Sequence, residues 1–457
     1  MIWLLAWAAL TRLPLILSGT IPFSFDHGRD SLAVLHLIKT GNPVFIGPWT
    51  SIPGLFFGPG WYYLLAPAYF LGQGNPVSAV WLMFLLGLIQ IALAYKYLGV
   101  YEAIMIAAAP LWLQLATGAA NPFPMTLIGL LLVIALKKNW QPFLTGLILG
   151  LGWHFSSALA VLWLLVVPWL VKPKHWLKLA LGIFITFIPQ LLFELKHNFS
   201  QTQALINYFT AGESQRINPG KITIVTQSII HELGLAILPD IPWLFVIGLL
   251  VVGAGIILWP KIGLLIVIPL IGFWFLHYNP WYAYGLAPLA VALVGKVLRR
   301  LPKPIVWAYC LLLIFASIPK AKPGLTAYKA FLPAKSAAIN YIYDRAGGRP
   351  FASYHYHPEI YDYAYQYLYI WRAFNGRPLP VEFSYQPGAP TYVNEKANLL
   401  AKLPTANGQP EKIFLIIEKP DNVWHYPFDS WLKQIKFSKI VDKKIIGPEL
   451  EVWQVNP

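Results

Sequence analysis

The feature that most constrains this chain is its series of long apolar runs, which are separated by short polar or Pro/Gly breaks. Hydrophobic residues make up 57% of the 457 residues and charged residues only 12%, whereas a soluble domain carries about 25% charged residues. Many runs approach the roughly 20 residues that a helix needs to cross a bilayer. The pattern predicts a mainly α, polytopic membrane helix bundle.

We place about 11 transmembrane helices along the first 318 residues. Their approximate ranges are 2–19, 78–98, 102–118, 123–136, 142–155, 157–171, 176–193, 241–258, 262–276, 282–297 and 304–318. Residues 1–19 lack a charged n-region and a cleavage site, so we expect a retained first helix. The runs 142–155 and 157–171 are short, and a single long span is the alternative.

Basic residues between the runs select one topology, because cytoplasmic loops are enriched in Lys and Arg. With a cytoplasmic N-terminus and eleven spans, the inner loops carry Lys96, Lys137, Lys138, Lys172, Lys174, Lys178, Lys261, Lys296, Arg299, Arg300 and Lys303. Merging residues 142–171 into one helix would scatter these cations over both sides, so we keep two helices. The topology predicts a multi-pass protein of the cytoplasmic membrane.

This topology divides the chain into a transmembrane domain, 1–318, and an extracytoplasmic domain, 319–457. The first has extracytoplasmic loops at 20–77 and 194–240. In the second, polar residues, Tyr and Gly/Pro turns become frequent, and the pattern predicts a small α/β domain. We expect strands at 350–355 and 412–418, helices at 359–371 and 429–435, and a hairpin of 440–446 with 449–455.

Composition and missing motifs exclude several classes of function. The net charge of +15 comes from cations at the ends of apolar runs, and no basic stretch interleaved with aromatics indicates a nucleic-acid partner. A single cysteine, Cys310, permits no internal disulfide and no thiolate metal site. The chain has no Gly-rich phosphate loop with its Lys, no His-Glu-x-x-His and no Gly-x-Ser-x-Gly.

The densest charge in the first part of the chain is Asp26-His-Gly-Arg-Asp30, just after the first apolar run. We expect a short amphipathic helix at 31–40 with Gly41 as its C′ residue. If this helix begins early, Asp26 and Asp30 share one face, where they could hold a divalent cation or act as general base and orienter. Asp30 has a second reading as a helix N-cap.

Several segments together resemble a known family. They are Arg12-Leu-Pro, Asp26-His-Gly-Arg-Asp30, Gly47-Pro-Trp-Thr-Ser51, Gly58 to Pro67, Pro189 to His197 and Tyr282 to Pro288. The pattern resembles the GT-C superfamily of integral membrane glycosyltransferases, in the branch of protein O-mannosyltransferases (glycosyltransferase family 39) and the lipid A aminoarabinose transferase. The resemblance covers about the first 318 residues.

The resemblance implies an inverting transfer of a sugar from a polyprenyl-phosphate donor, outside the cytoplasmic membrane. The acceptor stays open between protein, lipid and glycan. Asp26 matches the family's loop carboxylate, whose role is to accept a proton from the acceptor hydroxyl or to orient it. Asp30 is the second candidate acid, and Asp26 and Asp30 are the candidates for a divalent cation.

The departing phosphate of such a donor requires cations or hydrogen-bond donors. Arg29 is the first candidate, with a surface ion pair to either Asp as its alternative. His154, His277 and Tyr278 lie near outer helix ends and are further candidates. Satisfied interfacial residues are the alternative for all three.

Three residues at the second outer loop are candidates for the acceptor site or for a lid over it. Glu194 and His197 sit at a helix end, where ordinary boundary residues are the alternative. Arg216 lies in the loop itself. Arg12 is expected to snorkel to the interface or to pair with a carboxylate such as Asp26.

The rival function is a lipid-linked sugar flippase or transporter that does no chemistry. Transporters place ionisable residues at mid-membrane and often contain internal repeats. Here most ionisable residues lie at the outer edge and no repeat is visible, so an enzyme is favoured. Its predicted partners are the polyprenyl-phosphate-linked sugar, the acceptor and membrane lipids.

Overall fold

The computed structural model describes residues 1–210, 219–318, 330–389, 393–406, 408–419 and 426–457. The chain divides into two compact units. The helical unit comprises Met1–Pro14, Val44–Leu64 and Trp81–Lys322. The sheet unit comprises Leu15–Pro43, Leu65–Val80 and Pro323–Pro457, so part of the first predicted loop belongs to the same unit as the C-terminal sheet.

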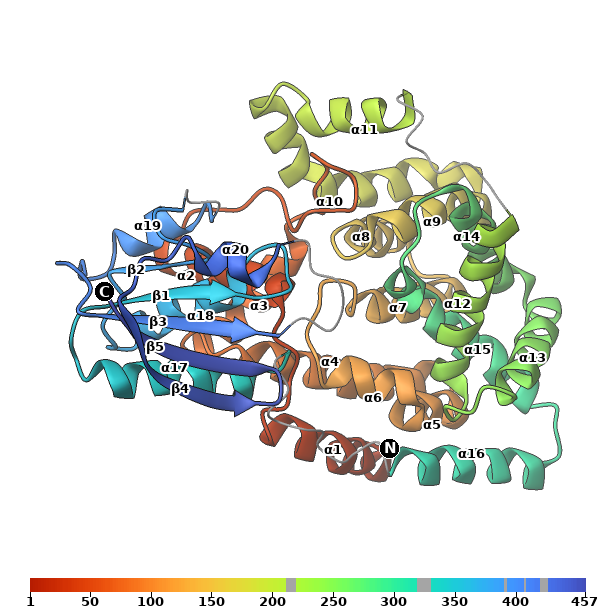
Figure 1. The fold of residues 1–457 in the computed structure, drawn as a ribbon. Helices are drawn as coiled ribbons and strands as arrows, with labels where there is room; N and C mark the ends of the chain where they lie inside the picture. The colour runs from red at the N-terminus through yellow and green to blue at the C-terminus, as the bar shows by residue number, and fades with distance from the viewer. Residues whose placement is uncertain (211–218, 319–329, 390–392, 407, 420–425) are drawn as a thin grey trace. The chain divides into compact units, whose positions relative to one another are not determined.

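Helices form nearly all of the helical unit (Figure 1). Its elements are α1 (Ile2–Leu17), α3 (Gly60–Leu71), α4 (Val77–Tyr97), α5 (Val100–Ala108), α6 (Pro110–Ala116), α7 (Met125–Lys138), α8 (Pro142–Trp153), α9 (Ser157–Leu170), η1 (Pro173–His175), α10 (Trp176–Lys196), α11 (Ser200–Thr210), α12 (Pro219–Ile237), α13 (Leu244–Leu258), α14 (Pro260–Phe275), η2 (Pro280–Leu286), α15 (Ala287–Leu298) and α16 (Lys303–Ser317). Three of these helices, α1, α3 and α4, are shared with the sheet unit.

Three helical segments in the described part of the chain are long and apolar enough to cross a membrane: Val77–Tyr97, Pro173–Lys196 and Pro280–Leu298. Six further apolar helices are shorter, between 10 and 17 residues. These segments support a membrane protein. The expected count of about 11 spans is not confirmed, because prolines and glycines interrupt the apolar runs before they reach spanning length.

Proline explains the clearest difference from the predicted helices. The expected helix 102–118 is two helices, α5 and α6, which break at Ala109. Pro110 lacks the N–H that would continue the α5 ladder, and it begins α6 instead. The expected pair 142–155 and 157–171 is confirmed as two helices, α8 and α9.

The predicted outer loop 194–240 is largely helical, which the sequence analysis missed. It contains α11 and α12, and α12 packs against α13, α14, α15 and η2. Polar residues interrupt the apolar pattern of α12, yet its buried side chains Val225, Ile229 and Leu233 recur every four residues. Tertiary packing of this narrow stripe stabilises a helix that overall hydrophobicity does not reveal.

The sheet unit is built on a five-stranded sheet of order β2-β1-β3-β5-β4. The strands are β1 (Phe351–Tyr356), β2 (Glu382–Ser384), β3 (Lys412–Glu418), β4 (Lys439–Gly447) and β5 (Leu450–Asn456). β1 is parallel to β2 and β3, whereas β5 is antiparallel to both β3 and β4. The expected strands and the C-terminal hairpin are confirmed. Only the three-residue strand β2 was not predicted.

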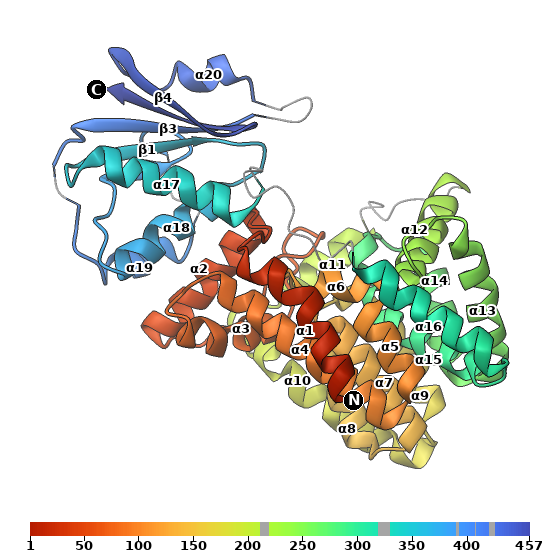
Figure 2. The same cartoon turned by 90° about the horizontal axis from the view of Figure 1, so that it is seen from below.

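Helices cover both faces of this sheet (Figure 2). α17 (Leu332–Ala346) and α18 (Tyr363–Phe374) lie on one face, and the short α20 (Phe428–Leu432) lies on the other. On the α20 side, Trp431 packs with alternate residues of β1 and β3, including Tyr354 and Leu415. Because successive side chains of a strand point to opposite faces of the sheet, the other residues of β1 and β3 face α17 and α18.

The N-terminal part of the sheet unit contributes α2 (Phe25–Thr40) and the end of α3 (Gly60–Leu71). A short antiparallel bridge ties residues 21–23 to the start of α17: Phe23 N–H donates to Ala330 at 2.8 Å, and Leu332 N–H donates to Ile21 at 2.9 Å. α18 packs directly on α2. The helix that carries the Asp26 motif is therefore part of the C-terminal fold.

Candidate functional site

The charged motif lies in the first two turns of α2. The helix begins at Phe25 with Ser24 as N-cap, six residues before the expected start. Asp30 is therefore inside the helix, and its reading as an N-cap is wrong. The expected end is confirmed, because Gly41 adopts the left-handed conformation with φ of 73°.

Arg29 bridges the two carboxylates of the motif. Its Nη1 lies 2.7 Å from Asp26 Oδ1, and its Nη2 lies 2.8 Å from Asp30 Oδ1. Its Nε also donates to Asp30 Oδ1 at 2.9 Å. Asp26 and Asp30 therefore share one face of α2. The Asp26 side chain is 55% exposed and that of Asp30 only 7%, so Asp26 is the more accessible carboxylate of the two.

Two contacts hold the start of α2 against the C-terminal fold. Gly28 lies so close to α18 that a Cβ atom there would be 2.3 Å from the backbone nitrogen of Ala364. The Phe25 ring stacks on Tyr363 with centroids 6.4 Å apart. The glycine in Asp-His-Gly-Arg-Asp is thus required by close packing, and the motif's position depends on α18.

His27 closes the first turn of α2. Its Nδ1 accepts the Ser24 N–H at 3.1 Å, as the reciprocal half of a capping box does. Burial lowers the pKa of His27 to about 4, with the Asp26 charge opposing this shift and Arg29 adding to it. His27 is therefore neutral at pH 7 and acts as a helix cap.

Glu359 is a third carboxylate near the motif, and the sequence analysis did not select it. Its side chain accepts a hydrogen bond from the Phe25 N–H and senses the charge of Asp26. Burial, helped by the carboxylates of Glu418 and Asp26, raises the pKa of Glu359 to about 7 against the opposing effect of Lys335. The sequence offered only a weak signal, an acid before the Tyr-rich helix α18.

The proposed divalent cation gains no further ligands from this part of the chain. Among the described residues, no group of three or more His, Cys, Asp or Glu side chains is arranged to hold a metal ion. The Arg29 guanidinium lies between Asp26 and Asp30, where a shared cation would have to sit. It supplies positive charge to both carboxylates.

Both ring nitrogens of His154 contact backbone groups of the helical unit. Nδ1 accepts the Gly60 N–H at 3.1 Å, and Nε2 lies 3.0 Å from the Thr186 carbonyl. A Cβ on Gly58 would lie 2.1 Å from Nδ1, so the Gly58-Pro-Gly60 turn fits around this ring. The arrangement favours the backbone-satisfied reading of His154 over a phosphate contact.

Glu194 and His197 organise the turn between α10 and α11. The Glu194 carboxylate accepts the backbone N–H groups of Gln201 and Thr202, both at 3.0 Å, and the Thr202 hydroxyl at 2.6 Å. It thus caps the first turn of α11. His197 stacks on Phe193 with centroids 4.0 Å apart. Both contacts favour the boundary reading, and Arg216 lies outside the described residues.

His277 and Tyr278 follow α14 and lie in a polar group of the helical unit. His277 Nε2 is 3.3 Å from Asn279 Nδ2, and the Tyr278 hydroxyl is 3.1 Å from the Ser228 hydroxyl of α12. Partial burial and the nearby charge of Lys221 on α12 lower the pKa of His277. Lys221 is a cation beside His277 that the sequence analysis missed, because it treated α12 as loop.

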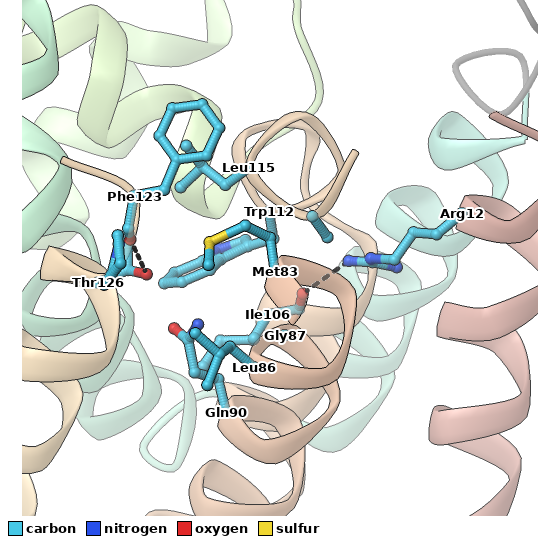
Figure 3. A pocket seen from close by; sticks show the side chains of 12 residues that line it. Arg12, Met83, Leu86, Gly87, Gln90, Ile106, Trp112, Leu115, Phe123 and Thr126 are labelled. Atoms are coloured by element: carbon cyan, nitrogen blue, oxygen red, sulfur yellow. Dashed lines mark hydrogen bonds between the residues drawn. The ribbon is translucent and has the colours of Figure 1, made fainter. Parts of the chain in front are cut away.

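Arg12 is buried inside the helical unit. Its Nη1 donates to the Ala107 carbonyl at 2.9 Å. Its Nη2 donates to the Ile106 carbonyl at 3.3 Å, the bond drawn in Figure 3. These carbonyls end α5, where Pro110 cannot supply the next N–H. The snorkelling expectation for Arg12 is therefore wrong, since the side chain is 2% exposed.

A small cavity adjoins Arg12 and Gln90, and Figure 3 shows both among its lining side chains. It measures about 20 Å³, room for about one water molecule. It is therefore no substrate site.

The sheet unit also contains a Ser-His-Asp arrangement. His355 Nδ1 lies 2.6 Å from Asp362 Oδ2, and Nε2 lies 3.2 Å from the Ser353 hydroxyl. All three residues are at most 1% exposed, so no substrate reaches Ser353. The network connects β1 to the start of α18 and has a structural role, since fully satisfied buried polar groups rigidify a core.

Comparison with solved structures identifies the fold. One matching structure is ArnT from Cupriavidus metallidurans in the apo state, with a TM-score of 0.62 at 15% identity, over 99% of this chain and 97% of that one. The chain has the fold of ArnT. A second match, ArnT from the same organism bound to undecaprenyl phosphate, has a TM-score of 0.58 at 13% identity over 99% and 98% of the two chains.

The ArnT likeness extends over both units, although the motif resemblance covered only about the first 318 residues. It supports the expected GT-C fold. No protein-family model and no curated protein sequence matches the chain.

Proposed function

We propose that this protein is an inverting membrane glycosyltransferase that moves a sugar from a polyprenyl-phosphate donor to an acceptor outside the cytoplasmic membrane. The observation that carries the proposal is the Asp26–Arg29–Asp30 group on α2, in a chain with the fold of ArnT over 99% of its length. One of those ArnT structures is described as bound to undecaprenyl phosphate, which supports a polyprenyl-phosphate partner here.

In this proposal Asp26 is the catalytic base. Its carboxylate accepts the proton of the acceptor hydroxyl as the hydroxyl oxygen bonds to the anomeric carbon. The bond from that carbon to the phosphate oxygen breaks, and polyprenyl phosphate leaves with the bonding electrons. The 55% exposure of the Asp26 side chain supports this assignment, because a base must lie within hydrogen-bond reach of the proton it takes.

Arg29 and Asp30 then act as positioning residues. The Asp30 side chain is 7% exposed and binds the Nη2 and Nε atoms of Arg29. The remaining nitrogen, Nη1 of Arg29, contacts Asp26 and orients its carboxylate. The guanidinium between the two carboxylates fixes the position of one relative to the other. This assignment replaces a direct phosphate contact by Arg29, because both edges of its guanidinium face carboxylates.

The leaving phosphate requires a separate donor group, and we assign His277, Tyr278 and Lys221 to it. His277 and Lys221 are close enough for the lysine charge to lower the pKa of His277. A cation next to a neutral imidazole can stabilise charge that develops on a phosphate oxygen. The acceptor class stays open between protein, lipid and glycan. Glu194 and His197 are engaged at the turn between α10 and α11, which leaves Arg216 as the candidate residue for the acceptor site or lid.

The deciding experiment measures release of polyprenyl phosphate from polyprenyl-phosphate sugars by protein in nanodiscs. We expect Asp26→Asn to lower turnover by about 100- to 10,000-fold, with the fold kept because the change is nearly isosteric. Asp344→Asn, at an exposed position of α17, is the matched control. Equal turnover of wild type and Asp26→Asn would remove Asp26 as base. Donor binding without product from any acceptor class would favour the flippase.

A further inference from the structure

A group of cations lies in the helical unit, among the ends of α5, α7, α14 and α15. A cavity of about 550 Å³ opens there, and four cations and one carboxylate line it with apolar side chains. The charged residues are Lys137, Lys261, Lys296, Arg299 and Glu102. The four cations belong to the inner-loop set that the sequence analysis used for topology, and the structure places them around one cavity.

Glu102 is fully engaged by Arg299. The guanidinium donates to both carboxylate oxygens at 2.8 and 2.7 Å, and also to the Gly295 and Leu98 carbonyls at 2.6 and 2.7 Å. Glu102 is 2% exposed, and a Cβ on Gly295 would lie 2.1 Å from its Oε1. This bidentate pair forms a fixed wall of the cavity, in which the charge of Arg299 offsets that of Glu102.

Three lysines remain at the cavity, each from a different helix. Lys137 ends α7, Lys261 lies in the first turn of α14, and Lys296 lies in the last turn of α15. Lys137 gives one N–H to the Tyr97 carbonyl at 2.9 Å, and an ammonium group has three. Lys261 and Lys296 make no ion pair within the described residues. Three like charges around one cavity favour an anion.

The surroundings of the cavity indicate an amphiphilic anion. Trp259 lines the cavity, and Trp is enriched where a membrane helix meets the headgroups. Near Trp259 in the sequence, Ile257 at the end of α13 is 78% exposed and Leu264 on α14 is 43% exposed. Leu98, Leu136 and Ala292 also line the cavity, and they would contact the apolar part of a molecule whose charge lies at the lysines.

We propose that this cavity binds a phosphate group, carried by the headgroup of an anionic membrane lipid. Cationic pockets between membrane helices bind such headgroups, and the apolar side chains that line the cavity together with the lysines favour a lipid over a free phosphate. The tendency of cytoplasmic loops to be basic explains cations at helix ends. It does not explain three lysines from separate helices around one cavity. None of the residues that line the cavity is among the proposed transferase residues.

The test compares binding of phosphatidylglycerol and phosphatidylcholine to the full-length protein by native mass spectrometry from mixed-lipid nanodiscs. The variant Lys261→Gln/Lys296→Gln removes two lysines from the cavity. We expect its affinity for phosphatidylglycerol to fall about 30-fold, since each cation near a lipid surface contributes about a factor of five. The control Lys174→Gln/Lys303→Gln removes the same charge from positions that do not line the cavity.

Two further arms make the result decisive. Lys261→Arg/Lys296→Arg keeps the charge and should keep phosphatidylglycerol binding, which separates lost charge from a folding defect. Inorganic phosphate is added as a competitor: no competition at millimolar concentration supports a lipid ligand, and full competition assigns the phosphate site to a soluble phosphate. Equal loss in the cavity and control variants, or no loss in either, would overturn the proposal.

Discussion

The backbones of Gly28 and Ala364 are in direct contact: a Cβ atom on Gly28 would lie 2.3 Å from the Ala364 nitrogen. This contact joins the helix that bears the Asp26 motif to the first turn of α18, more than 300 residues later in the sequence. The proposed catalytic base is thus positioned by the C-terminal fold.

Gly28→Ala should therefore destabilise the sheet unit and misplace Asp26. The added methyl group cannot be accommodated without moving α2 or α18, which costs about 2 kcal/mol or more. Thermal unfolding in detergent measures the loss, and turnover should fall with it. Gly253→Ala is the control, because a Cβ there meets no atom within 4 Å. An unchanged melting temperature for Gly28→Ala would contradict the packing described here.

Replacing Arg29 alone should destabilise the protein more than replacing Arg29 and Asp30 together. Arg29→Gln takes the guanidinium from the 7%-exposed Asp30 side chain, and breaking a buried charge pair costs about 3 kcal/mol or more. Arg29→Gln/Asp30→Asn should recover part of that stability because no uncompensated buried charge remains. Chemical denaturation of the four proteins in the cycle gives the coupling energy, and additive effects would show that the pair is not coupled.

Glu359 should make the stability of the sheet unit fall as pH rises. Its pKa is raised to about 7 in the fold, so between pH 4.5 and 7 the folded state holds a proton that the unfolded state has lost. Stability from this group is full at acidic pH and declines by up to about 3 kcal/mol toward pH 7. Unfolding of wild type and Glu359→Gln across this range checks the sign, since the variant should lack the decline.

In the same pH series, the contribution of His27 to stability should change with pH in the opposite direction to that of Glu359. Its pKa is lowered to about 4 in the fold, so below pH 6.5 the unfolded state binds a proton that the folded state excludes until about pH 4. Stability from His27 is present above pH 6.5 and is lost as the pH falls toward 4. His27→Asn, which keeps an acceptor for the Ser24 N–H, should remove this acid sensitivity. A parallel pH slope in wild type and variant would refute it.

The buried Lys335–Glu418 pair offers a test of the C-terminal core. Both side chains are at most 3% exposed, and Glu418 also accepts the Tyr365 hydroxyl. Lys335→Met should cost about 3–5 kcal/mol, because it leaves a buried carboxylate without its ammonium group. Lys335→Met/Glu418→Gln should recover much of this loss, as measured by denaturant unfolding. A double variant as unstable as the single one would contradict the charge argument.

The sequence by itself determined the membrane class, most helix positions, the C-terminal strands and the motif at Asp26. These depend on local quantities: apolar run length, period-two alternation, and Gly or Pro at breaks. The hairpin of β4 and β5 and the Gly41 helix end were predictable because neighbouring residues decide them. The start of α2 at Phe25 was not predicted, because it depends on the hydrogen bond that closes the cap between Ser24 and His27.

Tertiary structure alone decided which partner each polar group finds. Arg12 caps α5 where Pro110 breaks the helix. His154 forms hydrogen bonds with the backbone of Gly60 and Thr186. Glu194 caps α11. Glu359 reaches the Asp26 helix from more than 300 positions away. Such pairings join residues that are far apart in the chain, and the energy of burying a polar group depends on the atom it meets after folding.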